Sequence, residues 1–306
     1  MRVLVTGAGG FLGRHLCLGL RARGADIVAI GRPLSRARGY VDHFVEMDAA
    51  PDRRDLEEIL IRYRPDALYH LAGCSAAFSL RDLYEANLFY AIELLQACRV
   101  LANAPKIVIA GSAAEYGRPL STGRLMNERD TAQPLNAYGE TKLAQTVHAM
   151  RQSDLPVVVA RIFNPIGEGL PAIRAVGRFV ERVKALEPLG GGVIETGPLD
   201  SIRDVADATE VSAALIDLMV KDIPTGEIYN LCTGKGTTMR DITDVLRALV
   251  PYEVLFQPKA GEAGVDWAVG DAGKLAAHNV VVRAPDLRSV LARMLSGISG
   301  GIEESA

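Results

Sequence analysis

The sequence predicts an α/β fold in which a doubly wound parallel sheet is followed by a smaller mixed lobe toward the C-terminus. In the first half, short apolar runs rich in β-branched residues alternate with amphipathic stretches of helical period, as in a parallel sheet covered by helices. After residue 164 this alternation ends. We therefore expect a first domain over residues 1–164, to which segments near 193–220 return, and a second lobe formed mainly by residues 165–306.

A glycine-rich turn lies between the first expected strand, at residues 3–5, and the first expected helix, which runs to about Arg21. Glycine lets the backbone bend sharply and lets a pyrophosphate approach, and a helix N-terminus offers free N–H groups to that anion. The spacing is G-x-x-G-x-x-G, so a plain strand–turn–helix connection is the alternative to a dinucleotide site. The candidate cofactor contacts in this turn are Gly7, Gly10, Phe11, Leu12 and Gly13.

The second expected strand, at residues 25–31, is followed directly by a cation. In dinucleotide folds an acidic residue at this strand end binds the ribose 2′-hydroxyl of NAD, whereas an arginine accommodates the 2′-phosphate of NADP. Here Arg32 stands at the strand end, Arg36 and Arg38 follow, and no carboxylate is available. The sequence therefore favours NADP(H) over NAD(H), which stays possible, and a merely solvated arginine loop is the alternative interpretation.

The third expected strand, at residues 44–47, precedes Asp48 and Ala49, which are candidate cofactor contacts. Asp48 could meet the adenine amino group, or it could cap the helix that we expect at residues 52–63. The pattern does not separate these two roles.

The fourth expected strand, at residues 67–71, brings another part of the chain to the cofactor, because ligands lie at the carboxyl ends of parallel strands. An amphipathic helix expected at residues 83–102 follows and carries Asn87, which marks a bend, a buried hydrogen bond or a solvent position. A fifth expected strand, at residues 106–110, leads to Ser112. The candidate cofactor contacts after the fourth strand are Leu71, Ala72 and Gly73.

A serine, a tyrosine and a lysine then follow in an order that suggests hydride transfer at a carbonyl. Tyr138 and Lys142 stand four residues apart, on one face of the helix expected to run from residue 136 to about 150. A phenol has an ordinary pKa of about 10, and a nearby ammonium would lower it toward neutrality. Ser112 would hydrogen-bond the substrate oxygen where charge develops. An ordinary surface pair gives the same Tyr–Lys spacing, but the preceding glycine turn favours catalysis.

The second half of the chain is expected to form the mixed lobe after a sixth strand at residues 157–160. Its expected elements are helices at residues 175–186, 207–220 and 239–249, and strands at residues 193–196 and 228–231. A Gly-rich turn at residues 190–192 separates the first helix from the first of these strands.

The composition excludes several classes of protein. The 306 residues carry a net charge of −3, which offers no electrostatic footprint for nucleic acid or a membrane surface. No apolar run reaches the length of a membrane span, and a strand is expected from residue 2, where a signal peptide would stand. The four cysteines and five histidines show no metal-ligand spacing. We therefore expect no metal, reduced thiols and a cytoplasmic location.

Taken together, the motifs resemble the extended short-chain dehydrogenases/reductases, a family of NAD-dependent nucleotide-sugar epimerases, dehydratases and reductases. The segments that carry the resemblance are residues 6–13 (TGAGGFLG), 70–73 (HLAG), 111–117 (GSAAEYG), 138–142 (YGETK), 161–164 (RIFN), 203–204 (RD) and 229–234 (YNLCTG). The resemblance covers almost the whole chain and implies a Rossmann-type sheet. It also implies a nucleotide-diphosphate-sugar substrate and a homodimer through the helices that begin near Asn87 and Tyr138.

The resemblance also assigns roles to individual residues. It implies that Ser112, Tyr138 and Lys142 are catalytic, and that Tyr138 and Lys142 also contact the cofactor. Asn87 falls on the family's structural asparagine and is included among the cofactor contacts. The implied substrate contacts are Ser75, Ser112, Asn164 and Arg203.

The residues after Ser112 separate the reactions within this family. Sugar-nucleotide dehydratases place an acidic residue or pair there, whereas this chain has Ala113 and Ala114, with Glu115 one position further. The best match is therefore to nucleotide-sugar 4-keto-6-deoxyhexose reductases, especially the type that acts on GDP-4-keto-6-deoxymannose. An NAD-dependent 4-epimerase is the alternative, followed by a non-sugar carbonyl reductase and a non-catalytic NADP(H) sensor. The nucleotide base and the sugar stay open.

Overall fold

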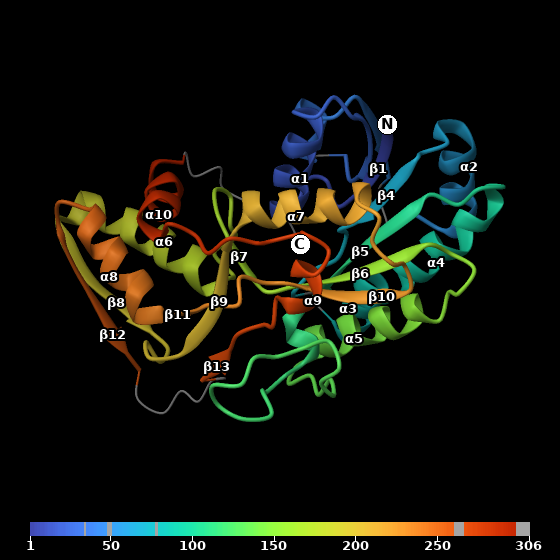
Figure 1. Ribbon diagram of the computed structural model, residues 1–306. Helices are drawn as coiled ribbons and strands as arrows, with labels where there is room; N and C mark the ends of the chain where they lie inside the picture. Colours follow the sequence, from blue (N-terminus) through green and yellow to red (C-terminus); the bar gives the residue numbers. More distant parts are fainter. Residues whose placement is uncertain (34, 48–50, 77–78, 260–265, 298–306) are drawn as a thin grey trace.

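A seven-stranded parallel sheet forms the larger part of the molecule, and smaller sheets and helices pack beside it (Figure 1). The computed structural model describes residues 1–33, 35–47, 51–76, 79–259 and 266–297. The α/β fold class predicted from the sequence is confirmed, including the smaller lobe of mixed strands.

The large sheet has the strand order β10-β6-β5-β4-β1-β2-β3, and every neighbouring pair is parallel. Its strands are β1 (Arg2–Thr6), β2 (Asp26–Gly31), β3 (His43–Glu46), β4 (Ala67–His70), β5 (Lys106–Ser112), β6 (Val157–Ile162) and β10 (Glu227–Leu231). The strand order reverses between β1 and β4. Strands β2 and β3 extend the sheet on one side of β1, and the later strands β4, β5, β6 and β10 extend it on the other side. The carboxyl ends of strands beside such a reversal leave a crevice for ligands.

Helices cover both faces of this sheet because its strands are buried on both sides. On one face lie α1 (Phe11–Arg21) and α7 (Ala208–Val220), whose apolar residues join the β1 and β2 side chains in one core. On the other face lie α2 (Arg53–Tyr63), α4 (Tyr90–Ala97) and α5 (Ala137–Met150), which share a second core with the same strands.

The helix expected at residues 83–102 is not one regular helix. It begins as α3 (Leu80–Tyr84), widens to a π-helical turn, η2 (Glu85–Phe89), continues as α4 and ends in a 3₁₀ turn, η3 (Cys98–Val100). The π-turn contains Asn87, whose side chain is fully buried. The sequence left three roles open for Asn87. The helix irregularity and the buried hydrogen-bonding position are observed, and the prediction of a solvent-exposed position is wrong.

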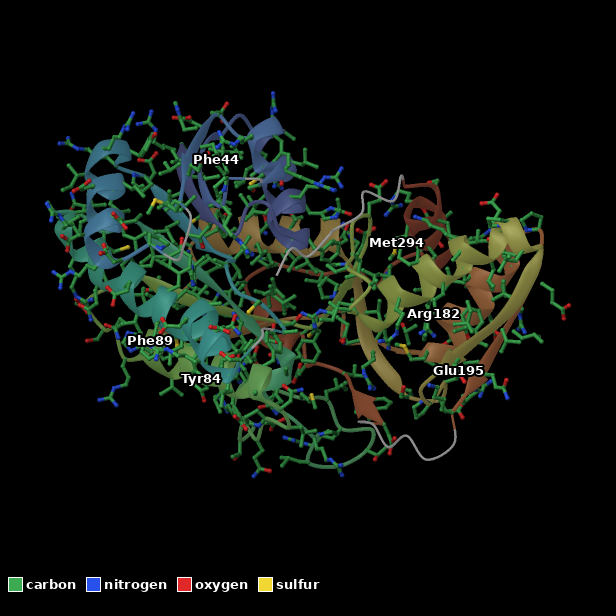
Figure 2. The ribbon with its side chains drawn as sticks, turned by 180° about the vertical axis from the view of Figure 1, so that it is seen from behind. Phe44, Tyr84, Phe89, Arg182, Glu195 and Met294 are labelled. Carbon is green, nitrogen blue, oxygen red and sulfur yellow. The ribbon has the colours of Figure 1, made fainter. Side chains whose placement is uncertain are left out.

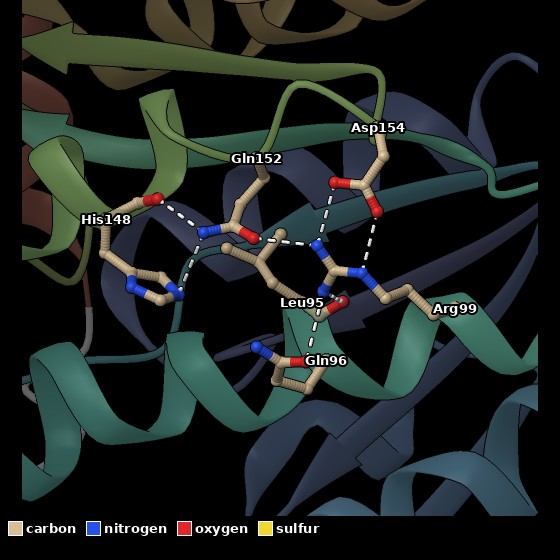
Figure 3. A network of polar contacts seen from close by, with 6 residues as sticks. All are labelled: Leu95, Gln96, Arg99, His148, Gln152 and Asp154. Atoms are coloured by element: carbon tan, nitrogen blue, oxygen red, sulfur yellow. Dashed lines mark hydrogen bonds and ion pairs between the residues drawn. The ribbon is translucent and has the colours of Figure 1, made fainter.

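A polar cluster joins the end of α4 to the end of α5 (Figure 3). The Arg99 guanidinium donates to both carboxylate oxygens of Asp154, at 2.7 and 2.9 Å, and to Gln152 at 2.8 Å. Gln152 in turn donates to the carbonyl of His148, on the last turn of α5. The Arg99–Asp154 ion pair is open to solvent, so it adds little stability, but it links the ends of the two helices.

The second lobe is built from short strands and three helices that share their own core (Figure 1). Strands β7, β11 and β13 each pair with β9 (Ile202–Asp207). Strands β8 and β12 pair in a separate parallel sheet. The remaining strands are β7 (Asn164–Ile166), β8 (Gly191–Thr196), β11 (Gly236–Thr238), β12 (Glu253–Pro258) and β13 (Trp267–Ala268). The helices are α6 (Ala175–Leu186), α8 (Met239–Leu249) and α10 (Leu287–Ser296), and η5 (Glu187–Leu189) follows α6. The other short segments adjoin the large sheet: η1 (Arg36–Gly39) follows β2, η4 (Ala113–Glu115) follows β5, and α9 (Gly273–Ala276) packs near β10.

The chain crosses between the two parts more than once. Strand β10, expected in the mixed lobe, is instead the edge strand of the large sheet, because α7 carries the chain back over that sheet and β10 then pairs with β6. Strand β8 lies in the second lobe. The segment 193–220 is thus divided between the two parts. Among the described residues, no helix has the length and apolar character that a membrane crossing requires.

Candidate active site

The turn from β1 to α1 requires glycine at two positions. Gly7 has φ +72°, and a Cβ there would collide with the Leu71 and Ala72 backbone. A Cβ on Gly13 would collide with the carbonyl oxygen of Gly7. Gly10, the N-cap of α1, has no side chain to cap the helix, and the first turn contains no acidic residue. The turn therefore leaves backbone N–H groups for an anion, which fits a dinucleotide pyrophosphate.

The end of β4 packs directly against this turn. The N–H of Leu71 donates to the Thr6 carbonyl at 3.1 Å, and the N–H of Ala72 donates to the Thr6 hydroxyl at 3.3 Å. Leu71 and Ala72 are half-buried, and Gly73 is exposed. Phe11 and Leu12 open α1 beside them and are also half-buried. The candidate cofactor residues of both segments thus lie together, and their contacts with a cofactor stay predictions.

His70 is a neutral structural residue beneath the site. It is fully buried, and its Nδ1 shares a hydrogen bond of 2.8 Å with the Thr6 hydroxyl. Burial, with the Lys142 charge as a second cause, lowers the pKa of His70 to about 3. The imidazole therefore carries no charge near neutral pH.

Ser112 ends β5 and is held by a buried ion pair. Its N–H donates to Oε1 of Glu115 at 2.8 Å, and Nε of Arg161 donates to Oε2 of the same carboxylate at 2.7 Å. Glu115 is fully buried, and Arg161 also lies over the Tyr116 ring at 4.5 Å. Because both carboxylate oxygens are engaged, Glu115 positions the serine backbone and is not placed to exchange protons with a substrate.

Tyr138 and Lys142 lie on the first turns of α5, which Asn136 caps by accepting the N–H of Gly139 at 2.9 Å. Lys142 is buried, and its ammonium donates to Oε1 of Gln145 at 2.7 Å. Burial lowers the pKa of Lys142, while Tyr138 is the largest of the groups that act in the opposite direction. We did not predict a role for Gln145 from the sequence, although its spacing of three residues from Lys142 places it on the same helical face.

Asn87 joins the loop after β4 to α5. Its Oδ1 accepts the N–H of Cys74, and its Nδ2 donates to the Cys74 carbonyl and to the Thr141 hydroxyl, each at 2.9 Å. The amide therefore fixes the backbone next to Gly73 and the turn of α5 that carries Lys142. Its described partners are all protein groups, and a direct contact with the cofactor stays a prediction.

A pocket of about 530 Å³ opens beside Tyr138. Its walls include Ser75, Asn136, Tyr138, Ile173 and Arg174. The Arg174 guanidinium carbon lies 5.6 Å from the centroid of the Tyr138 ring. Of these, Ser75 was a predicted substrate contact, whereas Arg174 carried no local signal, because its contact with Tyr138 joins residues 36 positions apart.

The predicted substrate residues Asn164 and Arg203 lie on neighbouring strands of the second lobe. β7 pairs with β9, and Nδ2 of Asn164 donates to the Asp204 carbonyl at 2.9 Å. Burial lowers the pKa of Arg203, whose described partner is the carbonyl of Ile202. Asp204 accepts N–H groups from Thr233, Gly234 and Gly270, so it ties three chain segments together beside these residues.

The segment after β2 carries the predicted NADP-selecting residues. Arg32 and Arg36 are both exposed there. Arg38 is engaged, since it pairs with Glu46 and lies over Phe44. Asp48 and Ala49 lie outside the described residues. Tyr40, which the sequence did not single out, donates its hydroxyl to the Ala8 carbonyl at 2.8 Å and so ties this segment to the glycine turn.

No metal centre is formed within the described part of the chain. There, no three histidine, cysteine, aspartate or glutamate side chains gather as ligands would.

Three curated proteins and a family model are similar to this chain. The model of the NAD dependent epimerase/dehydratase family matches residues 3–232. The dTDP-6-deoxy-L-talose 4-dehydrogenase (NAD(P)(+)) of Kitasatospora kifunensis is 30% identical over 86% of this chain and 84% of its own length. The GDP-6-deoxy-D-mannose reductase of Pseudomonas aeruginosa is 27% identical over 83% of this chain and 81% of its own. The UDP-glucose 4-epimerase of Rhizobium meliloti is 26% identical over 90% and 88%.

Solved structures share the fold. The UDP-glucose 4-epimerase of Thermus thermophilus, in complex with NAD, superposes with a TM-score of 0.83 at 24% identity, over 99% of this chain and 100% of that one. RMD of Pseudomonas aeruginosa, complexed with NADPH, gives a TM-score of 0.81 at 24% identity, over 96% and 97%.

Proposed function

The chain belongs to the NAD dependent epimerase/dehydratase family, and from this premise we propose that it uses NADPH to reduce the 4-keto group of a nucleotide-linked 4-keto-6-deoxy sugar. As a member of the extended short-chain dehydrogenase/reductase type, it is an NAD(P)-dependent enzyme that acts on a nucleotide sugar. One feature of the site favours reduction over the other reactions of this family.

That feature is the set of side chains around Ser112. The serine, Tyr138 and Lys142 provide the groups that carbonyl reduction needs, while Ala113 and Ala114 supply no acid for removing a sugar C5 proton. Glu115 is held by Arg161 and the Ser112 N–H. These observations favour proton donation to a carbonyl oxygen over dehydration.

In the proposed reaction, the Ser112 and Tyr138 hydroxyls bind the 4-keto oxygen, and Tyr138 donates the proton that the oxygen gains. When bound, the reduced nicotinamide supplies the hydride. The buried Lys142 ammonium stabilises the tyrosinate left on Tyr138, since opposite charges attract strongly where water is excluded. Arg203 and Asn164 bind the diphosphate of the substrate from the second lobe.

The proposed preference for NADPH rests on the strand end after β2. Arg32 is exposed at the point where a carboxylate would select NAD. Arg36 is exposed one turn further, in η1. A guanidinium fork suits the 2′-phosphate of NADP.

An NAD-dependent 4-epimerase is the second candidate, since the same three side chains serve that reaction and a 4-epimerase is among the relatives. The two differ in what happens to the cofactor. A reductase consumes NADPH in every cycle, whereas an epimerase regenerates its cofactor and shows no net change in absorbance.

We further propose a homodimer in which α3, η2 and α5 of two copies pack together. Leu80, Phe89 and Val147 lie on these elements and are each exposed by about half. Apolar side chains gathered on adjacent helices are typical of an interface.

The proposed reaction is tested by turnover with a panel of GDP-, dTDP- and UDP-linked 4-keto-6-deoxy sugars. We expect NADPH absorbance to fall with at least one of them and a 6-deoxy sugar to form. Tyr138→Phe removes only the hydroxyl, so turnover should fall by about a hundredfold to ten-thousandfold while NADPH binding stays.

Two results would contradict this proposal. Full activity of Tyr138→Phe would exclude Tyr138 as proton donor. Release of tightly bound NAD on denaturation, together with interconversion of UDP-glucose and UDP-galactose without NADPH loss, would favour the epimerase instead.

A further inference from the structure

The pocket beside Tyr138 contains a positive charge without a negative partner. Arg174 precedes the first turn of α6 and lines this pocket together with Tyr138. The lining includes serine hydroxyls and apolar side chains, and none of its described members is acidic. The pocket is therefore electropositive, which favours a ligand with negative charge on the side that faces Arg174.

The guanidinium of Arg174 has unused hydrogen-bonding capacity. Within the described residues it makes no ion pair and no side-chain hydrogen bond, and its one recorded contact is with the Tyr138 ring. Other arginines near the site differ, since Arg161 binds Glu115 and Arg293 binds Asp207. Contact with an aromatic ring holds a guanidinium in place but leaves most of its five N–H donors for another acceptor.

We propose that Arg174 binds an anionic oxygen of the substrate's nucleotide diphosphate, the group that carries the negative charge of a nucleotide-linked 4-keto-6-deoxy sugar. This inference rests on the proposed function, because it takes Tyr138 to face the reacting carbonyl. The anionic group that contacts Arg174 then belongs to the same substrate molecule as that carbonyl. Arg174 would thus hold the diphosphate from the pocket beside Tyr138, separately from Arg203, which lies on β9.

Pairs of ligands test whether Arg174 contacts the diphosphate or a charge elsewhere on the sugar. UDP-glucose and UDP-glucuronate differ only in whether C6 is an alcohol or a carboxylate, and GDP-mannose and GDP-mannuronate differ in the same way. Binding of all four is measured by calorimetry to wild type, Arg174→Ala and Arg174→Lys, each saturated with NADP⁺. Arg178→Ala is the matched control, since Arg178 is also exposed, lies one turn further along α6 and does not line the pocket.

Arg174→Ala should weaken binding by about tenfold to a hundredfold, the effect of losing a charged hydrogen-bond donor pair. Since all four ligands carry the diphosphate, all four should weaken to a similar extent, with or without a carboxylate on C6. Arg174→Lys should recover part of the affinity, because it keeps the charge and loses the fork. Arg178→Ala should bind as wild type does.

Three outcomes would overturn the inference: equal affinity of Arg174→Ala and wild type for all four ligands, a loss of affinity confined to the two uronates, or no binding of any of the four to wild type. The proposed reduction is judged by NADPH turnover instead. A wild type that reduces a keto sugar while Arg174→Ala binds normally would leave the reaction standing and remove only the role of Arg174.

Discussion

At the scale of single residues, two of the three proposed catalytic residues are held by a partner to which we assign no chemical step. Glu115 holds the Ser112 backbone, and Gln145 holds the Lys142 ammonium. Glu115 and Lys142 are buried, where an unpaired charge would be costly. The Arg161 and Gln145 contacts therefore keep these charged groups in the folded protein and fix their positions.

Arg32 is the residue whose replacement tests the cofactor preference. Arg32→Ala should weaken NADPH binding by about tenfold to a hundredfold and NADH binding little, because only NADPH carries the 2′-phosphate. The dissociation constants of both cofactors are measured by fluorescence titration of the reduced nicotinamide.

Arg129→Ala is the matched control for Arg32, since it removes an exposed guanidinium from a loop after β5. It should leave both dissociation constants unchanged. If Arg32→Ala weakens the two cofactors equally, the assignment of the 2′-phosphate to Arg32 is wrong.

At the scale of elements, the π-turn η2 decides where Asn87 points. One extra residue in this turn breaks the regular helical register between α3 and α4, as π-bulges do. The side chain then reaches both the loop after β4 and the α5 turn at Thr141. Three separate elements are thereby fixed around the cofactor side of the sheet.

Asn87→Asp tests this role with almost no change in shape. The carboxylate keeps the acceptor for the Cys74 N–H but loses both donations and adds a buried charge. We expect the free energy of unfolding to fall by about 3 kcal/mol, measured by urea denaturation at neutral pH.

Asn103→Asp is the control for Asn87, because that asparagine is exposed in the turn after α4. It should change stability little. If Asn87→Asp and wild type unfold at the same urea concentration, the two hydrogen bonds that Asn87 donates contribute no net stability.

At the scale of the whole molecule, the proposed site draws on two parts with separate cores. Strand β5 and helix α5 of the larger part carry Ser112, Tyr138 and Lys142, and strands β7 and β9 of the second lobe carry Asn164 and Arg203 (Figure 1). Tyr84 and Phe89 lie at one end of the molecule, far from Arg182 and Glu195 of the second lobe (Figure 2). The proposed dimer face is thus remote from the outer end of that lobe.

The proposed homodimer is tested by changing its apolar face. Phe89→Glu combined with Val147→Glu places charges where two copies would bury them, so sedimentation should show a monomer in place of a dimer. Leu189→Glu is the control, since Leu189 is 74% exposed on η5 in the second lobe. A wild type that sediments as a monomer, or a double variant that stays dimeric, would contradict the proposed face.

Several features follow from short-range patterns in the chain. The spacing of Gly7, Gly10 and Gly13 indicates a tight turn, because a Cβ on Gly13 would collide with the Gly7 carbonyl of the same turn. The alternation of apolar runs and amphipathic stretches predicts the parallel sheet, because strand and helix periods are local properties. Tyr138 and Lys142 share a face for the same reason.

Other features depend on contacts between distant segments. We could predict from the chain alone the fold class, the glycine turn and the order of Ser112, Tyr138 and Lys142, since each depends on local periodicity or spacing. The folded protein was needed to show that Glu115 pairs with Arg161, that β10 joins the large sheet and that Arg174 lies over Tyr138. These contacts join residues 36 or more positions apart, and the packing of whole elements brings them together.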